Sequence, residues 1–445
     1  MVARNRRGRL RQVKIAFVTL GCKLNYAETS TYERGFVAAG LEPVPWKDGA
    51  DVFLVNTCAV TETANRKSRG VIRKLHRISP AAPIVVTGCY AELRHDEVAA
   101  LDGVARVFRA SEKAGVVSGT LDIVGMTPEG GSPPAGRPSG EGPASGDSRS
   151  GVETGIMGAY SSGERTRSFL KVQDGCDNFC RYCTVPYARG RSRSIPICEA
   201  VRMAREIAAQ GIREIVLTGV NTGDFGRTTG ESFPDLLKAL NDVEGIDRYR
   251  ISSIEPNLLT EGIVDWIASG TKFQPHFHIP LQTGCDELLA AMGRRYTTSE
   301  FAQKISYIRD AMEGPGKPLV FFGIDVMAGL PGETPELFEK TYSFLEELHP
   351  SFIHVFPYSR RPGTPAATMP GQVSPEVKAE RAARLEALSS RLHAGFIEAN
   401  RGIHERVLWE SREKDGTMGG YTGNYIRLSR PWDPAKANTL EDIII

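Results

Sequence analysis

The chain contains, at positions 169–183, the stretch Phe169-Leu-Lys-Val-Gln-Asp-Gly-Cys176-Asp-Asn-Phe-Cys180-Arg-Tyr-Cys183, in which a candidate strand leads into a loop with three cysteines. The spacing C-x3-C-x2-C brings three thiolates close together. That is one fewer than the four that normally hold a [4Fe–4S] cluster, so one iron would stay free to bind a cofactor directly. The alternative is a structural zinc loop whose fourth ligand lies elsewhere, because short cysteine spacings are also typical of zinc sites.

A second set of cysteines lies in the first quarter of the chain. Three apolar runs, Val13–Leu20, Val52–Val55 and Ile84–Thr87, alternate with helical patterns, which is typical of a parallel sheet covered on both faces. Each run is followed by one cysteine: Cys22, Cys58 and Cys89. Ligands of open α/β sheets bind outside the carboxyl ends of the strands, so we expect these three thiols to converge there. Cysteine is also a common buried apolar residue, which is the alternative for each one taken singly.

Strand and helix patterns alternate again from 165 to 398. The six candidate strands are Phe169–Gln173, Glu214–Thr218, Tyr249–Ile254, His276–Ile279, Val320–Met327 and Ile353–Phe356. Six such units predict a partial parallel (β/α)6 barrel, whose chemistry collects at the carboxyl ends of its strands. The cysteine loop follows the first of these strands, where an active-site loop is expected.

Composition divides the chain into four parts. Residues 1–125 form the expected N-terminal α/β domain, and 126–164, rich in Gly, Pro, Ser and Glu, are expected to be a flexible linker. Residues 165–398 form the barrel. In 399–445 the alternating runs His404–Ser411 and Gly420–Leu428, joined by a turn around 415–420, predict a small antiparallel β module.

Charge and composition exclude some classes of protein. No segment approaches the ~20 consecutive apolar residues of a membrane span, and the basic N-terminus lacks the apolar stretch of a secretory signal, so we expect a cytoplasmic protein. The net charge of +2 indicates no strong global attraction to nucleic acid, although local basic clusters permit RNA binding. Because we expect a cytoplasmic protein, we expect its eight cysteines to be reduced. Cys198 and Cys285 belong to neither set and are expected to be small structural side chains.

The loop at Cys176–Cys183, with the aromatic Tyr182 before its third cysteine, resembles that of the radical S-adenosylmethionine (SAM) enzymes. In that family the amino and carboxylate groups of SAM fill the open position on the cluster. The ends of the following barrel strands carry side chains and backbone suited to SAM: Thr218, Gly219, Asn221, Ser253, Glu255 and Gln282, in addition to Tyr182. The simpler interpretation of the segment around Gly219 is an ordinary strand-to-helix turn.

With both cysteine sets, the barrel and the terminal β module, the chain resembles the methylthiotransferases, a radical-SAM family with two [4Fe–4S] clusters. Three stretches are similar to the branch that acts on N6-threonylcarbamoyladenosine at position 37 of tRNA: Thr19-Leu-Gly-Cys-Lys-Leu-Asn25, Asn178-Phe-Cys-Arg-Tyr-Cys-Thr-Val-Pro-Tyr-Ala-Arg-Gly190 and His354-Val-Phe-Pro-Tyr-Ser359. Sister branches modify isopentenyladenosine in tRNA or an aspartate of a ribosomal protein.

The resemblance implies a role for each cysteine set. It places Cys22, Cys58 and Cys89 on an auxiliary cluster and Cys176, Cys180 and Cys183 on the SAM cluster, with all six required for catalysis. It implies methylthiolation of adenosine C2, a tRNA anticodon loop as substrate, a flavodoxin- or ferredoxin-like electron donor and a separate sulfur source. The terminal module resembles the small RNA-binding (TRAM-like) barrel of the family. Residues 400–445 are short for all the strands of that barrel, so either the module is incomplete or it closes differently.

Substrate contacts are expected from four further residues. Arg189, Arg191 and Arg193 follow the cysteine loop and could steer tRNA phosphates, and His278 lies near the mouth of the fourth barrel strand. A histidine in such a place is more often structural than catalytic. Outside the enzymes, the remaining alternative is a zinc-dependent RNA-binding protein.

Overall fold

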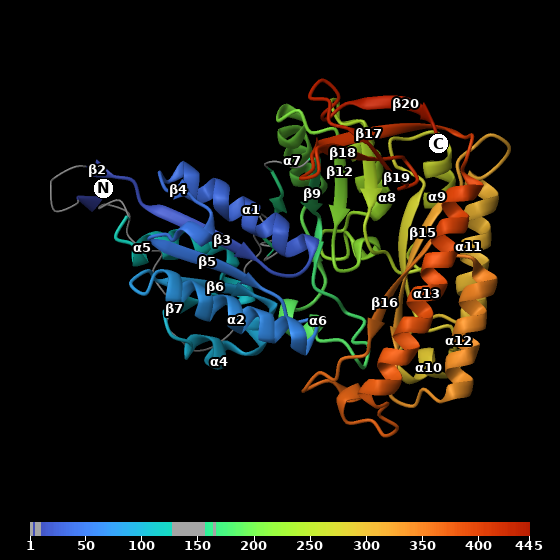
Figure 1. Ribbon diagram of the computed structural model, residues 1–445, viewed down its shortest axis with the longest axis horizontal. Helices are drawn as coiled ribbons and strands as arrows, with labels where there is room; N and C mark the ends of the chain where they lie inside the picture. The colour runs from blue at the N-terminus through green and yellow to red at the C-terminus, as the bar shows by residue number, and fades with distance from the viewer. Residues whose placement is uncertain (1–2, 5–9, 127–155, 163–165) are drawn as a thin grey trace, which may run out of the picture.

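The computed structural model describes residues 3–4, 10–126, 156–162 and 166–445. Its parts are an N-terminal parallel sheet, a partial barrel and a C-terminal antiparallel sheet, as the fold class predicted (Figure 1). The predicted linker, 126–164, lies largely outside the described residues. Within its described part, β8 (Ala159–Tyr160) pairs antiparallel with the first barrel strand.

The N-terminal sheet has five parallel strands in the order β4-β3-β5-β6-β7. They are β3 (Lys14–Thr19), β4 (Glu42–Pro43), β5 (Val52–Thr57), β6 (Ile84–Gly88) and β7 (Val104–Val107), with a separate hairpin of β1 (Ala3–Arg4) and β2 (Leu10–Arg11) before them. The helices are α1 (Lys23–Ala38), α2 (Glu62–Ile78), α3 (Cys89–Leu93), α4 (His95–Ala99) and α5 (Val116–Ile123), with short 3-10 turns at Trp46–Asp48 and Ala110–Gly115.

Alternation along β5 explains how both faces of this sheet are covered. Val52 and Leu54 pack with residues of α1 and α5, whereas Phe53 and Val55 pack with residues of α2, α3 and α4. All four side chains are fully buried. A strand buried on both faces needs a continuous apolar run, and that run is the pattern seen in the sequence.

The barrel consists of two groups of three parallel strands. The first is β13-β12-β9 and the second β14-β15-β16; the isolated parallel bridges Tyr249–Phe273 and Ser253–His278 join them. The strands are β9 (Arg167–Lys171), β12 (Glu214–Thr218), β13 (Arg248–Ile251), β14 (His276–Gln282), β15 (Phe321–Ala328) and β16 (Phe352–Pro357). All six match strands predicted from the sequence to within a few residues.

Helices surround the barrel on its outer side (Figure 1). They are α7 (Ile197–Ala209), α8 (Phe233–Asn241), α9 (Glu261–Ala268), α10 (Asp286–Ala291), α11 (Thr298–Met312), α12 (Pro335–Leu348) and α13 (Pro375–Ala399). Shorter elements in the connections are β10 (Gln173–Asp174), α6 (Val185–Arg189), β11 (Arg193–Ser194) and 3-10 turns at Thr222–Asp224 and Pro365–Ala367.

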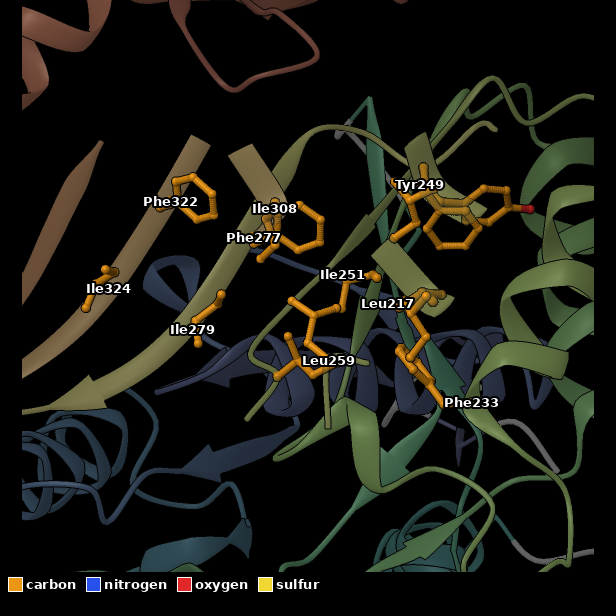
Figure 2. Packing of buried hydrophobic residues seen from close by; sticks show 14 of the residues in the cluster. Leu217, Phe233, Tyr249, Ile251, Leu259, Phe277, Ile279, Ile308, Phe322 and Ile324 are labelled. Carbon is orange, nitrogen blue, oxygen red and sulfur yellow. The ribbon is translucent and has the colours of Figure 1, made fainter. Parts of the chain in front are cut away.

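The main hydrophobic core lies between the barrel strands and these helices. Leu217 lies next to Phe233 of α8, and Ile251 lies next to Leu259 (Figure 2); Ile279 of β14 and Ile308 of α11 belong to the same cluster. Each such fully buried side chain contributes about 1.5–3 kcal/mol relative to an exposed one. The apolar residues of each strand point outward to the helices, which leaves the alternate positions, many of them polar, for the inside of the barrel.

The C-terminal module is a four-stranded antiparallel sheet in the order β19-β18-β17-β20. Its strands are β17 (His404–Arg412), β18 (Thr417–Tyr421), β19 (Arg427–Pro431) and β20 (Leu440–Ile444). The antiparallel prediction is confirmed, but the single strand expected at Gly420–Leu428 is wrong. A tight turn interrupts it, because the Thr422 hydroxyl accepts from Ile426 N at 2.8 Å and Tyr425 adopts a left-handed backbone, φ 68°.

This module covers the end of the barrel at which the strands begin. Arg248, the first residue of β13, donates to Tyr421 O at 3.0 Å, and Arg250 donates to Thr422 O and Gly423 O at 2.8 and 2.7 Å. The opposite end, where the strands finish, is therefore the one open to chemistry. Among the described residues, no helix is both long and apolar enough to cross a bilayer.

Candidate active site

The structure brings the three N-terminal cysteines to one edge of the sheet. Cys22 caps α1 after β3, Cys58 follows β5, and Cys89 begins α3 after β6. The thiols of Cys22 and Cys89 both act electrostatically on Cys58. The turn before Cys22 needs glycine: Gly21 has φ +105°, and a Cβ there would lie 2.9 Å from the Cys58 sulfur. We call these three residues the auxiliary triad.

Burial raises the pKa of Cys58 and of Cys89, and the neighbouring thiols raise both further. Three neutral thiols packed together gain little from one another, whereas a cation would stabilise them as thiolates. The described cysteines form no disulfide. The donor set therefore fits an iron–sulfur cluster with three protein ligands.

Two buried arginines reach the auxiliary triad from the barrel. Arg189 donates to Asn25 Oδ1, and its Nη2 lies 3.9 Å from the Cys22 sulfur. Arg361, from the loop after β16, donates to Ala59 O, next to Cys58, and its Nε and Nη1 have no partner within the part of the chain that the structure describes. Sequence reasoning missed Arg361, because nothing local distinguishes it from a surface arginine.

The loop after β9 and β10 holds the other three cysteines with hydrogen-bond donors aimed at their sulfurs. Asn178 N lies 3.4 Å from Cys176 Sγ, and Val185 N lies 3.4 Å from Cys183 Sγ. Arg294 Nη1 lies 3.3 Å from Cys180 Sγ. N–H groups directed at cysteine sulfurs are typical of cluster sites, where they tune the reduction potential. We call these three cysteines the SAM triad.

Burial raises the pKa of Cys176 to about 11 and that of Cys183 to about 12, and the other thiols of the SAM triad add to both shifts. As at the auxiliary triad, cysteines this close and this buried need a cation to become thiolates. The three residues fit a [4Fe–4S] cluster that has one iron without a protein ligand.

Two of the predicted SAM residues meet at Arg294. Glu255 forms an ion pair with Arg294, whose Nη1 also lies 3.5 Å from the Tyr182 hydroxyl. Tyr182 packs beside Met292, Leu330 and Tyr358, among others. Arg294 thus connects Cys180, Tyr182 and Glu255, although it follows α10 and lies more than a hundred positions from the cysteine loop. Sequence reasoning did not identify it.

The buried Gln173 holds the turn that contains two other predicted SAM residues, Gly219 and Asn221. Gln173 Oε1 accepts from Val220 N and Asn221 N at 2.9 and 3.0 Å, and its Nε2 donates to Gly175 O at 2.8 Å. It therefore ties the base of the cysteine loop to the turn after β12. A Cβ on Gly219 would lie 2.8 Å from Gln173 Oε1, so this turn has no room for a larger residue.

The remaining candidates lie at the same barrel end. Asn221 Oδ1 accepts from Glu255 N at 3.3 Å, and the Thr218 side chain is buried against Val216 O. Ser253, half-buried, bridges to His278 across the strand gap, and Gln282 is half-buried with φ +75° at the end of β14. Their role in binding SAM stays a prediction.

The three predicted phosphate-binding arginines differ in exposure. Arg189 is only 3% exposed and pairs with Asp174 at 2.9 Å, so its burial is at odds with a contact to phosphate. Arg193 is mostly engaged by backbone, donating to Arg189 O at 2.7 Å. Arg191 alone has an exposed side chain, 75%, which lies over the Phe179 ring and pairs with Asp177 at 3.3 Å.

His278 belongs to a polar group on the inner face of the second barrel half. Its Nε2 lies 2.8 Å from Asp325 Oδ1, and its ring stacks on His354 with centroids 4.9 Å apart. Burial and His278 lower the pKa of His354 to about 4, so that ring is neutral at pH 7. Cys198, exposed, and Cys285, which donates to Glu287, take no part in either triad.

Comparisons with known proteins identify the family of this chain. A sequence profile described as the radical SAM superfamily matches residues 170–345, and another, uncharacterized protein family UPF0004, matches 14–109. The threonylcarbamoyladenosine tRNA methylthiotransferase MtaB of Bacillus subtilis (strain 168) is 38% identical over 429 residues, 93% of this chain and 89% of the relative. The chain belongs to the radical-SAM methylthiotransferase family. It is therefore an enzyme of a class that uses SAM and a [4Fe–4S] cluster, which favours a cluster over structural zinc.

Other relatives of this methylthiotransferase differ in the substrate that their names give. MtaB of Aquifex aeolicus (strain VF5) is 34% identical over 94% of this chain and 97% of the relative. The tRNA-2-methylthio-N(6)-dimethylallyladenosine synthase of Alkaliphilus oremlandii (strain OhILAs) is 31% identical over 92% of this chain and 85% of the relative. Among solved structures, the radical SAM methyltransferase TsrM of Kitasatospora setae has a TM-score of 0.56 at 17% identity, covering 80% of this chain and 74% of that one; this likeness concerns the fold alone.

Proposed function

We propose that this methylthiotransferase replaces the C2 hydrogen of N6-threonylcarbamoyladenosine, at position 37 of tRNA, with a methylthio group, and that it does so with two [4Fe–4S] clusters. Three relatives that are 34–38% identical over most of the chain are named for that nucleoside. The observation that carries the two-cluster part is Arg189. It comes six residues after Cys183 and contacts Cys22, so one buried side chain connects the SAM loop to the auxiliary triad.

Each triad would hold one cluster: Cys22, Cys58 and Cys89 the auxiliary one, and Cys176, Cys180 and Cys183 the one that binds SAM. When bound, these groups supply the radical chemistry that an unactivated C–H bond requires and that acid–base catalysis cannot provide. The chain's own task is to bind and orient the reactants. Arg294 holds Glu255 beside the SAM triad, where this carboxylate would accept a hydrogen bond from SAM.

The substrate base must reach the space between the two triads. An adenosine of the anticodon loop is unpaired or readily extruded, so it can leave the stack and enter an active site. Exposed Arg191, beside the SAM loop, would contact a phosphate of that loop. A flavodoxin- or ferredoxin-like donor would supply electrons and a separate source the sulfur. We expect the protein to act in the cytoplasm, where tRNA is found.

The test is nucleoside analysis by mass spectrometry after anaerobic reconstitution with iron and sulfide. Anticodon stem-loops would carry N6-threonylcarbamoyladenosine, N6-dimethylallyladenosine or plain adenosine at position 37. We expect a methylthio product from the first alone, and none from a Cys58→Ala variant. Product from the dimethylallyl loop alone, or only from a ribosomal protein, would replace this function with that of a sister branch. Full activity of the Cys58→Ala variant would refute the role of the auxiliary triad.

A further inference from the structure

Lys23 is the residue directly after Cys22 of the auxiliary triad, and the first residue of α1. Its side chain crosses from the N-terminal domain to the barrel, where the ammonium lies 5.9 Å from the centre of the Phe169 ring on β9. Tyr26, one turn further along α1, meets the same ring edge-on at 6.2 Å and is partly exposed. Lys23 is itself exposed to solvent. A cation is therefore held at the junction of the two domains, next to a proposed cluster ligand.

The charged residues that act electrostatically on Lys23, namely Arg167, Arg250 and Asp325, already have other partners. Glu410 pairs with Arg167 at 2.7 Å, Glu214 pairs with Arg250 at 2.9 Å, and Asp325 accepts from His278. Within the described residues, Lys23 makes no hydrogen bond and no ion pair. Its electrostatic neighbours are Tyr425, Arg167, Arg250 and Asp325. Arg167 and Arg250 are neutralised by their own carboxylates, so within the described residues Lys23 is the cation of this group that has no hydrogen-bonded or ion-paired anion.

An unpaired ammonium at such a place is suited to an anion brought by the substrate. Charge-assisted hydrogen bonds are stronger than neutral ones, and a lysine that meets an apolar group instead would lose water without compensation. The threonylcarbamoyl group carries a carboxylate at the end of its N6 chain, whereas a dimethylallyl group carries no polar atom. These two substituents therefore differ most at the atom that an ammonium recognises.

We propose that Lys23 binds the carboxylate of the threonylcarbamoyl group and thereby selects this nucleoside over those with an apolar N6 substituent. The inference rests on the proposed function and deepens it. Lys23 holds the substituent by its far end, so the base is anchored beside the auxiliary triad. A site that hydrogen-bonds a substrate group discriminates strongly against analogues that lack it, because its own polar atom is then left unpaired.

The experiment compares two stem-loops that differ in one group. One carries N6-threonylcarbamoyladenosine and the other its carboxamide, in which the carboxylate is replaced by a neutral amide. Dissociation constants are measured anaerobically on the reconstituted protein without SAM, so that no turnover occurs. We expect the wild type to bind the carboxylate loop about ten- to a hundredfold more tightly than the carboxamide loop. Lys23→Met should bind both loops equally, with the same value as the wild type for the carboxamide.

Matched variants separate recognition from folding. Lys304→Met removes a lysine from α11 that is far from both triads in sequence and whose ammonium lies 6.0 Å from the centre of the Tyr307 ring, and it should keep the full preference. Lys23→Arg keeps the charge and should keep most of the preference. If Lys23→Met loses iron, Lys23→Gln gives the same comparison with a smaller change in shape. Steady-state kinetics should show the loss mainly in KM.

The outcomes distinguish this inference from the proposed function. If the wild type makes no methylthio product from the threonylcarbamoyl loop, the proposed function fails. If it does, and Lys23→Met still prefers the carboxylate, the inference alone fails. Equal weakening of both loops by Lys23→Met would also overturn it, because that result indicates a structural role for Lys23.

Discussion

At the scale of single residues, Gly88 shows how tightly the auxiliary triad is built. It joins β6 to Cys89 with φ +99°, a backbone conformation that favours glycine. A Cβ at this position would lie 2.3 Å from Thr57 O and 2.6 Å from Thr57 N, both backbone atoms of the strand that leads to Cys58. The close approach of these two strand ends sets the separation of the two cysteines.

We expect Gly88→Ala to destabilise the protein by about 3 kcal/mol or more, since it adds steric overlap to the cost of a left-handed residue. Gly40→Ala is the matched control: φ there is +88°, but nothing lies within 4 Å of the added carbon. That control should cost about 1–2 kcal/mol. Urea unfolding of both variants measures the difference. Equal losses would mean that Gly88 is required only for its backbone conformation.

Sequence alone could predict the cysteines of the two triads, but not the distant side chains that contact the cysteines or hold their loops in place. Regular spacing and the repeated strand-then-cysteine pattern identify both triads without any long-range information. Arg294, Arg361 and Gln173 gain their meaning only from partners far along the chain, such as Cys180, 114 positions from Arg294. For Arg189 the sequence was misleading. Its place in a run of arginines predicted an exposed contact to tRNA phosphates, but the fold buries it between the carboxylates of Glu28 and Asp174.

At the scale of elements, the segment from α6 to β11 separates buried from exposed charge. Arg189 ends α6 and points into the protein, whereas Arg191, two positions later, points outward. Gly190 makes this reversal possible with φ +78°. One short connection therefore places one cation in the interior and another on the surface.

We expect Arg191→Gln to weaken tRNA binding and to lower the slope of log affinity against log salt by about 0.7–0.9, the value for one phosphate contact. Filter binding over a range of salt concentrations measures this slope. Arg384→Gln, on the outer helix α13 and away from both the SAM loop and the C-terminal module, is the control. An unchanged slope in Arg191→Gln would remove this residue from the tRNA interface.

Elements with strong periodicity were predictable and those set by local hydrogen bonds were not. The buried parallel strands follow directly from continuous apolar runs. The turn between β18 and β19 could not be predicted from such a pattern. It is held by Asn424, whose side-chain amide donates to two atoms far along the chain, Leu319 O at 3.0 Å and Asn400 Oδ1 at 2.9 Å. An alternating pattern on both sides of that turn is indistinguishable from one longer strand.

At the scale of the whole molecule, a buried charge network joins the N-terminal domain to the barrel. Glu28 of α1 accepts from Lys113 at 2.8 Å and from Lys171 of β9 at 2.6 Å, and Asp174 pairs with Lys171 and Arg189. Burial alone would raise the pKa of Glu28, but Lys113, Lys171 and Arg189 hold it well below its usual value. The pKa of Asp174 is also held well below its usual value, chiefly by Arg189 and Lys171, although burial alone would raise it.

We expect Glu28→Gln to destabilise the protein by about 3–5 kcal/mol, because buried Lys113 loses its counter-charge and buried Lys171 keeps only that of Asp174. Glu339→Gln, which breaks an exposed pair with Arg384, should cost less than about 1 kcal/mol. Both folded-state pKa values are depressed, so the stabilisation is present above the ordinary value of 4.5 for Glu28 and is lost as pH falls below it. Thermal melts from pH 7 to pH 3 should show a smaller pH effect in Glu28→Gln; an equal effect would contradict the network's role.

The central claim is that each cysteine triad holds its own cluster, and iron content tests it most directly. After anaerobic reconstitution the wild type should contain about eight irons per chain, two cubes of four. Variants with alanine at all three cysteines of the auxiliary triad, or at all three of the SAM triad, should each retain about four. A wild-type content of about four, or a triple variant with the same iron content as the wild type, would contradict the account.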